Sequence, residues 1–398
     1  MKGWISIFVM AALAVPWILI KFTGAHLEPH LIAILSGLAI VASSFLLTWG
    51  AELAEMEVSK SLALAFLAIV TVLPEYAVDM YLSWMAGKDQ VYTHYAVANM
   101  TGANRLIIGL AWATVVFIFW FKTKKTTVEL GAPITNEFTF LTLATLYSFV
   151  IPLKKNLSLV DAAVFLLLFI GYIVLASRAK VEEPHLEGPA AEVARLSRSM
   201  RRLVTVIFFL FSCFVILISA SAFAESLITT GKLLKIEEFL LIQWLAPLAS
   251  EAPEFIVAAL FALKCNPVNG MGALISSKVN QWTLLVGMIP LVFSISSGSV
   301  HPMPLDGRQV EEVLLTSAQS LFAIAILADL RISVWEALSL LVLFVTQLLM
   351  PWQAARLAFS WVYILLAVGI LVAKRQKLFC LIGYITGASK KLCGKGKC

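Results

Sequence analysis

Residues 247–255 read PLASEAPEF, and residues 71–80 read TVLPEYAVDM. Both stretches have apolar surroundings, yet each carries two acidic residues, one of which directly follows a proline. A carboxylate inside a hydrocarbon layer is costly unless it meets a cation, a cavity or a basic partner. These two stretches therefore decide how the rest of the chain is interpreted.

The composition predicts a membrane protein. The chain has 398 residues, of which 60% are hydrophobic and 14% are charged, values outside the range of soluble globular domains. Apolar runs recur from end to end, and each is long enough to cross a hydrocarbon layer of about 30 Å. We expect an all-α polytopic membrane protein with about twelve transmembrane helices. The expected spans are 4–22, 29–50, 60–86, 93–120, 134–151, 158–177, 203–228, 236–263, 268–295, 311–330, 332–350 and 356–373.

The distribution of basic residues predicts the topology. Cytoplasmic loops are enriched in Lys and Arg, and most of the 30 basic residues lie at the two ends of the chain and in the even-numbered loops. Both termini are therefore expected in the cytoplasm, and the protein is expected in the plasma membrane. The net charge of +6 follows from this bias, so no nucleic-acid partner is expected.

The two acidic stretches form an internal repeat. Pro74–Tyr76 aligns with Pro253–Phe255, and the second glutamate follows the first by 179 residues. These segments fall in the third and eighth expected spans, so an odd number of crossings separates them. The second copy is therefore inverted, and folds of this kind bind their substrate near the bilayer midplane.

The repeat divides the chain into two inverted-topology five-helix repeats, with one flanking helix at each end. Residues 29–177 form the first expected repeat and residues 203–350 the second. The remaining parts are an extra N-terminal transmembrane helix at 1–28, a charged cytoplasmic linker at 178–202, and a further helix with a basic cytoplasmic tail at 351–398.

The acidic residues and the prolines predict a cation site. A proline removes one amide donor and frees the carbonyl four residues earlier, and carbonyl and carboxylate oxygens are hard ligands that suit Na⁺ or Ca²⁺. Asp79 lies one turn after Glu75, and Glu251 lies one turn before Glu254, so each pair shares a helix face. Some of the polar residues could instead form hydrogen bonds between helices. The candidate cation-binding residues are Glu75, Glu254, Glu251, Asp79, Asn104, Thr71, Ser250, Ser277 and Gln281, with Glu75 and Glu254 as the metal ligands.

Both segments resemble the alpha repeats of the cation/calcium exchanger superfamily. The family pattern is Gly-Thr/Ser-Ser-x-Pro-Glu in one helix and Gly-Asn-x-x-Gly-Ser-Asn in the next. This chain has VTVLPE and LASEAPE for the first motif, and ANMTGANRL and MGALISSKVNQ for the second. The chain is identified as a divergent member of this sodium/calcium exchanger-like group.

The resemblance implies a secondary active cation antiporter of sodium/calcium exchanger type, which works by alternating access around a midplane carboxylate site. It implies that Glu75 and Glu254 are the central ligands and that the partners are inorganic cations and the lipid bilayer. The transported cation is then Ca²⁺ or Na⁺, or H⁺, and no cofactor is expected. The protein is not expected to be an enzyme, because its five histidines form no H-E-x-x-H helix.

Several positions depart from the family pattern. Lys278 occupies the place in the second copy that Asn104 occupies in the first, Arg105 directly follows Asn104, and Ile107 and Gln281 stand where the family often has Asn or Asp. Arg105 and Lys278 are expected to compensate charge, and three alternatives are open for them.

In the first alternative both basic side chains point at the carboxylates, which favours a proton-coupled monovalent cation exchanger or a transport-inactive scaffold or sensor. In the second they snorkel to an interface, which leaves divalent transport open. In the third they form fixed salt bridges between helices.

Overall fold

The computed structural model describes residues 2–54, 56, 72–177, 186 and 188–379. The chain divides into two compact units. Unit 1 comprises residues 1–99, 173–253 and 295–297, and unit 2 comprises residues 100–172, 254–294 and 298–398.

The expected all-α membrane architecture is confirmed. Within the described residues, eight helices are long and apolar enough to cross a membrane, or nine if a broken pair counts as one span. Each of the twelve expected spans coincides with a helix or a run of helices in the described part of the chain. Three of these spans contain only short helices there, of 14 to 16 residues, and so fall below the length of a full crossing.

Unit 1 contains helices from both halves of the sequence. Its complete helices are α1 (Lys2–Thr23), α2 (Pro29–Ala54), α4 (Leu73–Ala86), α10 (Gly188–Ala194), α11 (Arg198–Leu234) and α12 (Glu238–Ser250). It also contains the first half of α5 (Tyr92–Leu106) and the last turn of α9 (Leu159–Ala176).

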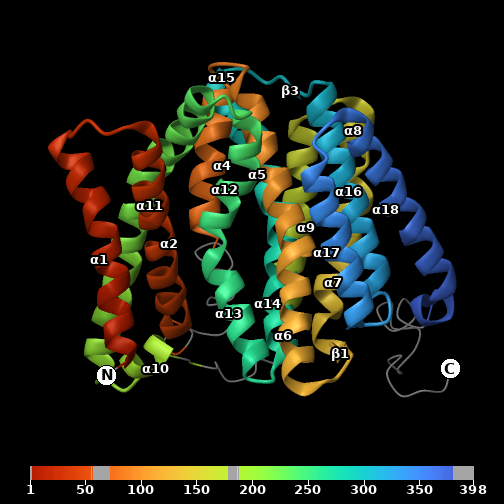
Figure 1. Cartoon of the computed structure of the whole chain (residues 1–398), viewed down its shortest axis with the longest axis horizontal. Helices are drawn as coiled ribbons and strands as arrows, with labels where there is room; N and C mark the ends of the chain where they lie inside the picture. Colours follow the sequence, from red (N-terminus) through yellow and green to blue (C-terminus); the bar gives the residue numbers. More distant parts are fainter. Residues whose placement is uncertain (1, 55, 57–71, 178–185, 187, 380–398) are drawn as a thin grey trace. The chain divides into compact units, whose positions relative to one another are not determined.

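The long helices α2 and α11 form the centre of unit 1, and α1 packs on α2 (Figure 1). Gly37 of α2 permits the close approach, since a Cβ atom there would lie 2.9 Å from Cε2 of Phe223 on α11. Helix α4, which carries the first acidic stretch, and α12, which ends just before Glu251 of the second, pack against α11. Their shared apolar core includes Val78, Leu227 and Ala246, so burial of this core holds α4 in place.

Unit 2 contains the remaining helices and four short strands. The helices are the rest of α5 and α9, most of α13 (Ala252–Leu263) and α15 (Val286–Ser297), and the whole of η1 (Ile107–Trp112), α6 (Ala113–Thr123), η2 (Ala132–Ile134), α7 (Thr135–Ser148), α8 (Val150–Lys154), α14 (Pro267–Asn280), η3 (Gln281–Leu285), α16 (Gly307–Leu327), α17 (Val334–Leu349) and α18 (Gln353–Ala373). The strands are β1 (Thr127–Glu129), β2 (Asn156–Leu157), β3 (Met303–Pro304) and β4 (Arg331–Ser333).

The strands of unit 2 pair reciprocally between the two halves of the sequence. β1 pairs antiparallel with β4, with Val128 opposite Ile332, and β2 pairs antiparallel with β3, with Leu157 opposite Met303. β1 and β3 are the first strands of the two repeats in chain order, and β2 and β4 are the second strands. Each pair therefore joins the first strand of one repeat to the second strand of the other. Such exchange of equivalent contacts is the mark of a two-fold relation, as an inverted repeat requires.

Three expected spans depart from a regular α-helix. The span predicted at 236–263 is broken between α12 and α13 at Glu251. The spans predicted at 93–120 and 268–295 each contain a π-helical segment, η1 and η3 respectively. The helix predicted at 236–263 is therefore broken in the structure. The other two predicted spans each lie within one continuous helix, Tyr92–Thr123 and Pro267–Ser297, and apolar periodicity does not register their π turns.

Candidate cation-binding site

The two Pro-Glu stretches have the same local backbone geometry. Val72 precedes α4 with φ −92° and ψ 4°, and Glu251, which aligns with it, precedes α13 with φ −98° and ψ 0°. Each helix then has a proline in its first turn, followed directly by Glu75 or Glu254. A proline is tolerated there because the first amides of a helix have no intrahelical acceptor. Both glutamates therefore lie at a helix N-terminus, where the helix dipole favours negative charge.

In unit 1, α4 presents one buried polar face. Glu75 is 3% exposed, while Asp79 and Ser83, each one turn further along, are fully buried. The side chain of Asp79 lies beside that of Asn99, which is also fully buried. Among the described residues, the neutral Asn99 amide faces the Asp79 carboxylate, but no side-chain atom of either residue meets strict hydrogen-bond geometry. A buried carboxylate in this state needs a bound proton or cation.

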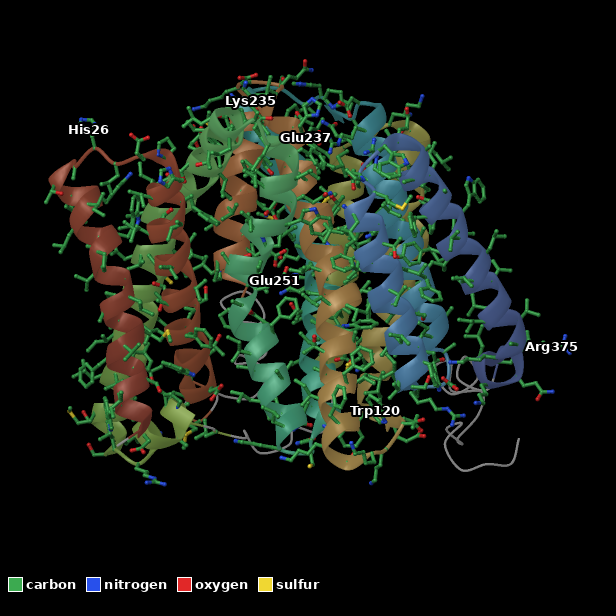
Figure 2. All side chains as sticks on the ribbon, in the orientation of Figure 1. His26, Trp120, Lys235, Glu237, Glu251 and Arg375 are labelled. Atoms are coloured by element: carbon green, nitrogen blue, oxygen red, sulfur yellow. The ribbon has the colours of Figure 1, made fainter. Side chains whose placement is uncertain are left out.

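Two further candidates lie at the end of α12, also in unit 1. Glu251 is 2% exposed, and Figure 2 labels it where this helix ends. Ser250 is buried, and its hydroxyl donates to its own helix, to the carbonyls of Ala246 at 3.2 Å and Pro247 at 3.3 Å. Its oxygen keeps acceptor capacity for a cation. Thr71 lies outside the described residues, as does Val70, whose carbonyl was expected to be freed by Pro74.

In unit 2, Glu254 lies on α13 with its Oε2 atom buried. No hydrogen-bond partner for this oxygen occurs among the residues that the structure describes. The next helix, α14, approaches α13 very closely, because a Cβ atom at Gly270 would lie 2.7 Å from the carbonyl oxygen of Ala258. A glycine at this position therefore lets α13 and α14, the two motif helices of the second repeat, pack backbone against backbone.

Asn104 and Lys278, which occupy equivalent places in the two repeats, contact each other in unit 2. The Lys278 ammonium donates to Asn104 Oδ1 at 2.6 Å and lies 4.3 Å from the centroid of the Trp282 ring. Asn104 Nδ2 donates to the Met100 carbonyl at 2.8 Å. Both residues are fully buried, so Lys278 does not snorkel to an interface. The amide oxygen predicted as a cation ligand accepts a hydrogen bond from a fixed cation instead.

Arg105 forms an ion pair that the sequence analysis did not identify. Its Nη2 atom donates to Glu312 Oε2 of α16 at 2.5 Å, and the two side chains are 3% and 4% exposed. Of the three alternatives for Arg105, the structure contains the fixed salt bridge between helices. Glu312 lies 207 residues away in the sequence. In the sequence, the only feature that pointed to Glu312 was its place in an acidic pair, Glu311 and Glu312, at the start of an apolar helix.

The π-helical segments begin at the same distance after the second motif in both repeats. η1 starts three residues after Asn104, and η3 starts three residues after Lys278. The candidate Gln281 is the first residue of η3 and is 1% exposed, whereas Ser277 is half-buried in α14. Single π turns within helices occur frequently at functional sites, because the extra residue widens the turn and redirects side chains.

A further polar chain approaches α14 from α7 and α9. The hydroxyl of Tyr172 lies 3.2 Å from Glu137 Oε1 and 2.8 Å from Ser276 Oγ. Since a phenol has one proton, Tyr172 donates to Glu137 and accepts from Ser276. Among the described residues, no group of three or more His, Cys, Asp or Glu side chains is placed to hold a metal ion.

The comparison with protein families decides the assignment. The model of the sodium/calcium exchanger protein family matches residues 29–178 and 204–353. The chain belongs to this family. Its members are transporters and not enzymes, and the expected repeat of two exchanger halves in a multi-pass membrane protein is confirmed. A search of curated proteins gave no match.

Three solved structures place this exchanger chain among known folds. A structure described as the H⁺/Ca²⁺ exchanger CAX has 48% sequence identity to it and a TM-score of 0.93, covering 97% of this chain and 98% of that one. The native structure of YfkE has 15% identity and a TM-score of 0.60, covering 90% and 99%. The sodium-calcium exchanger NCX_Mj has 19% identity and a TM-score of 0.50, covering 79% and 95%. The last two similarities concern the fold alone.

Proposed function

We propose that this exchanger moves Ca²⁺ across a membrane in exchange for H⁺, by alternating access around a site formed by the Pro-Glu motifs. The observation that carries this proposal is that, among the described residues, Glu254 Oε2 is buried without a hydrogen-bond partner and the buried Asp79 carboxylate lies beside the neutral amide of Asn99. A carboxylate in apolar surroundings has to be neutralised. Ca²⁺ and H⁺ both neutralise carboxylates, and they compete for the same oxygens.

This competition couples the two ions. When the site holds Ca²⁺ or protons, it is close to neutral, and the protein can switch the side of the membrane to which the site is open. When the site is empty, its buried negative charge opposes this switch. Only loaded forms therefore change access, and each Ca²⁺ that moves one way is matched by protons that move the other way.

Two observations favour H⁺ over Na⁺ as the coupling ion. The chain is 48% identical to a solved H⁺/Ca²⁺ exchanger. In addition, Ile107 stands where the family often has an amide or a carboxylate, and Asn104 Oδ1 is bonded to Lys278, so fewer neutral oxygens are left for Na⁺ than in the family pattern. Na⁺ is the alternative coupling ion, and a proton-coupled monovalent exchange is the alternative transport mode.

We assign Glu75 and Glu254 as the central cation ligands. Both follow a proline at a helix N-terminus and occupy equivalent positions in the two repeats. The proposed supporting residues are Glu251, Asp79, Thr71, Ser250, Ser277 and Gln281. Asn104 was predicted with them, but its Oδ1 accepts a hydrogen bond from Lys278. The plasma membrane location, with both termini in the cytoplasm, is proposed from the loop charges.

Transport in proteoliposomes tests the proposed exchange. An outward proton gradient should drive uptake of ⁴⁵Ca²⁺ by the wild-type protein, and an outward Na⁺ gradient at equal pH should not. Glu75→Gln and Glu254→Gln should abolish uptake, because an amide binds neither Ca²⁺ strongly nor a proton. Glu129→Gln is the matched control, since Glu129 lies on β1 with 72% of its side chain exposed. Unchanged uptake in both motif variants would refute the site, and uptake driven by Na⁺ alone would refute the coupling.

A further inference from the structure

We infer that Glu137 is a proton-binding site outside the proposed cation site, and that Tyr172 transmits its protonation to Ser276 in the second motif. The inference rests on the proposed exchange of Ca²⁺ for H⁺, because it concerns how protons weaken the binding of Ca²⁺. Glu137 lies in the first turn of α7, Tyr172 lies near the end of α9, and Ser276 lies in α14. All three residues belong to unit 2.

The surroundings of Glu137 allow its carboxyl group to be either neutral or charged. Its Oε2 atom is buried, and no other residue in the described part of the chain donates a hydrogen bond to it. Among the same residues, no basic side chain forms an ion pair with Glu137. Burial therefore favours the neutral carboxyl, whereas the N-terminus of α7 and the hydrogen bond from Tyr172 favour the carboxylate. A carboxyl under such opposing influences can bind and release a proton.

The chain of hydroxyl groups that starts at Glu137 is complete in both protonation states. When Glu137 is charged, Tyr172 donates to its Oε1 atom across 3.2 Å, and Ser276 donates to Tyr172 across 2.8 Å. When Glu137 is protonated, its O–H group can donate to Tyr172, and Tyr172 then donates to Ser276. Each state contains the same hydrogen-bonded pairs and needs no movement of heavy atoms. Proton binding at Glu137 thus reverses both hydrogen bonds.

The direction of these hydrogen bonds matters for a cation at the second motif. When Glu137 is charged, the hydroxyl protons point away from α14, and a chain of this kind polarises the Ser276 oxygen so that it becomes more negative. When Glu137 is protonated, the Ser276 oxygen accepts a hydrogen bond from Tyr172 instead. Ser276 directly precedes Ser277, one of the proposed supporting residues. Ca²⁺ should therefore favour the charged form of Glu137, and a proton on Glu137 should weaken Ca²⁺ binding by the same factor.

The first repeat lacks a hydroxyl group at the equivalent place. Because Asn104 is equivalent to Lys278, Gly102 is equivalent to Ser276. A glycine has no side chain that could accept a hydrogen bond from a tyrosine. The proposed proton site therefore acts through the second repeat.

Calcium binding measured over a range of pH tests this role. The purified whole protein is titrated with Ca²⁺ in a calorimeter, and the Kd is compared between the wild-type protein and Glu137→Gln. The glutamine keeps the size of the side chain and is always neutral, so it resembles the protonated carboxyl. At alkaline pH, Glu137→Gln should bind Ca²⁺ at least about fivefold more weakly than the wild-type protein. The two proteins should converge as the pH falls, because the wild-type carboxyl is then protonated as well.

Further variants test the transmission. In Tyr172→Phe the phenol oxygen is missing, so an added Glu137→Gln substitution should lose most of its effect on the Kd, as a double-mutant cycle measures. Ser276→Ala removes the other end of the chain, so its Ca²⁺ binding should also be weaker and less dependent on pH, and it serves where Glu137→Gln fails to fold. Tyr147→Phe is the matched control, since the Tyr147 hydroxyl donates to Asp161 of α9 and joins the same two helices. Its Kd should follow that of the wild-type protein at every pH.

The outcomes separate the two proposals. If the wild-type protein shows no proton-driven Ca²⁺ uptake in proteoliposomes, the proposed exchange is wrong. If the wild-type protein transports, but Glu137→Gln and Tyr172→Phe bind Ca²⁺ as it does at every pH, the proton site is refuted. A loss of affinity in Glu137→Gln that is equal at every pH would also refute it, because a residue that only supports the fold would behave in this way. An effect of Glu137→Gln that persists in full without the Tyr172 hydroxyl would refute transmission through Tyr172.

Discussion

Arg105 of α5 and Glu312 of α16 form an ion pair of 2.5 Å between two almost fully buried side chains. Each residue belongs to a different half of the sequence, and both lie in unit 2. Close by in the sequence, Glu311 accepts hydrogen bonds from Arg356 and Gln353 of α18. The charged start of α16 therefore connects a motif helix on one side with the C-terminal helix on the other.

Removal of one member of this pair should destabilise the protein strongly. Glu312→Gln leaves the Arg105 guanidinium buried without its carboxylate, which costs about 3–5 kcal/mol. The double variant Arg105→Met, Glu312→Met removes both charges and should lose much less. Melting of the detergent-solubilised protein measures both effects, with the exposed Glu129→Gln as control. A Glu312→Gln protein that melts at the wild-type temperature would contradict a structural role for this ion pair.

Two glycines of α14 should respond in opposite ways to the same substitution. Gly270→Ala places a methyl group against the backbone carbonyl of Ala258, which cannot rotate away, and should cost about 1–3 kcal/mol. Gly272 has no atom within 4 Å of an added Cβ, so Gly272→Ala should stabilise the helix by about 0.5–1 kcal/mol. The difference between the two melting temperatures is the measurement. If both variants shift the melting temperature equally, the close packing of α13 on α14 is not as described.

The thermal stability of the protein at acidic pH should depend on Asp329, which lies between α16 and β4. Burial raises the pKa of the Asp329 carboxyl. This carboxyl accepts hydrogen bonds from Lys374 at 2.9 Å, Lys377 at 3.0 Å and Arg331 at 2.8 Å. The hydrogen bonds outweigh burial and hold the pKa below its ordinary value of 3.8. Because the pKa is lower in the folded state than in the unfolded state, the stabilisation is complete above that ordinary value and is lost as the pH falls through the folded-state value.

Asp329→Asn should therefore cost about 1–3 kcal/mol at neutral pH. Below pH ~4 the difference from the wild-type protein should narrow, since the wild-type carboxyl is then itself protonated. Melting temperatures of both proteins over a series of pH values measure this difference. A gap that stays constant down to the lowest pH would show that the charge of Asp329 contributes nothing.

The sequence predicted those features that depend on one segment at a time. Long apolar runs located the helices, since length and hydropathy alone determine what can cross a membrane. The aligned Pro-Glu stretches identified two equivalent segments, which the sequence placed inside continuous spans. The structure shows that each stretch lies at the start of a helix with the same backbone geometry. The equivalent places of Asn104 and Lys278 also followed from the alignment of the two motifs.

Features that depend on pairs of distant segments could not be predicted in this way. The partner of Arg105 lies 207 residues away, and hydropathy does not specify which helix faces which. The contact of Lys278 with Asn104 depends on the rotation of α5 and α14 about their axes, which hydropathy does not specify. The role of Gly270 became visible only when Ala258 was found against it.

Release of protons on calcium binding tests the central claim most directly, namely that the motif carboxylates hold either Ca²⁺ or H⁺. Ca²⁺ is added to the purified protein in weakly buffered detergent solution, while a pH indicator and a calorimeter record released protons and bound Ca²⁺. The wild-type protein and Glu129→Gln should release protons as they bind Ca²⁺, whereas Glu75→Gln and Glu254→Gln should bind Ca²⁺ weakly and release fewer. Tight Ca²⁺ binding without proton release, or equal binding and release in all four proteins, would contradict the account.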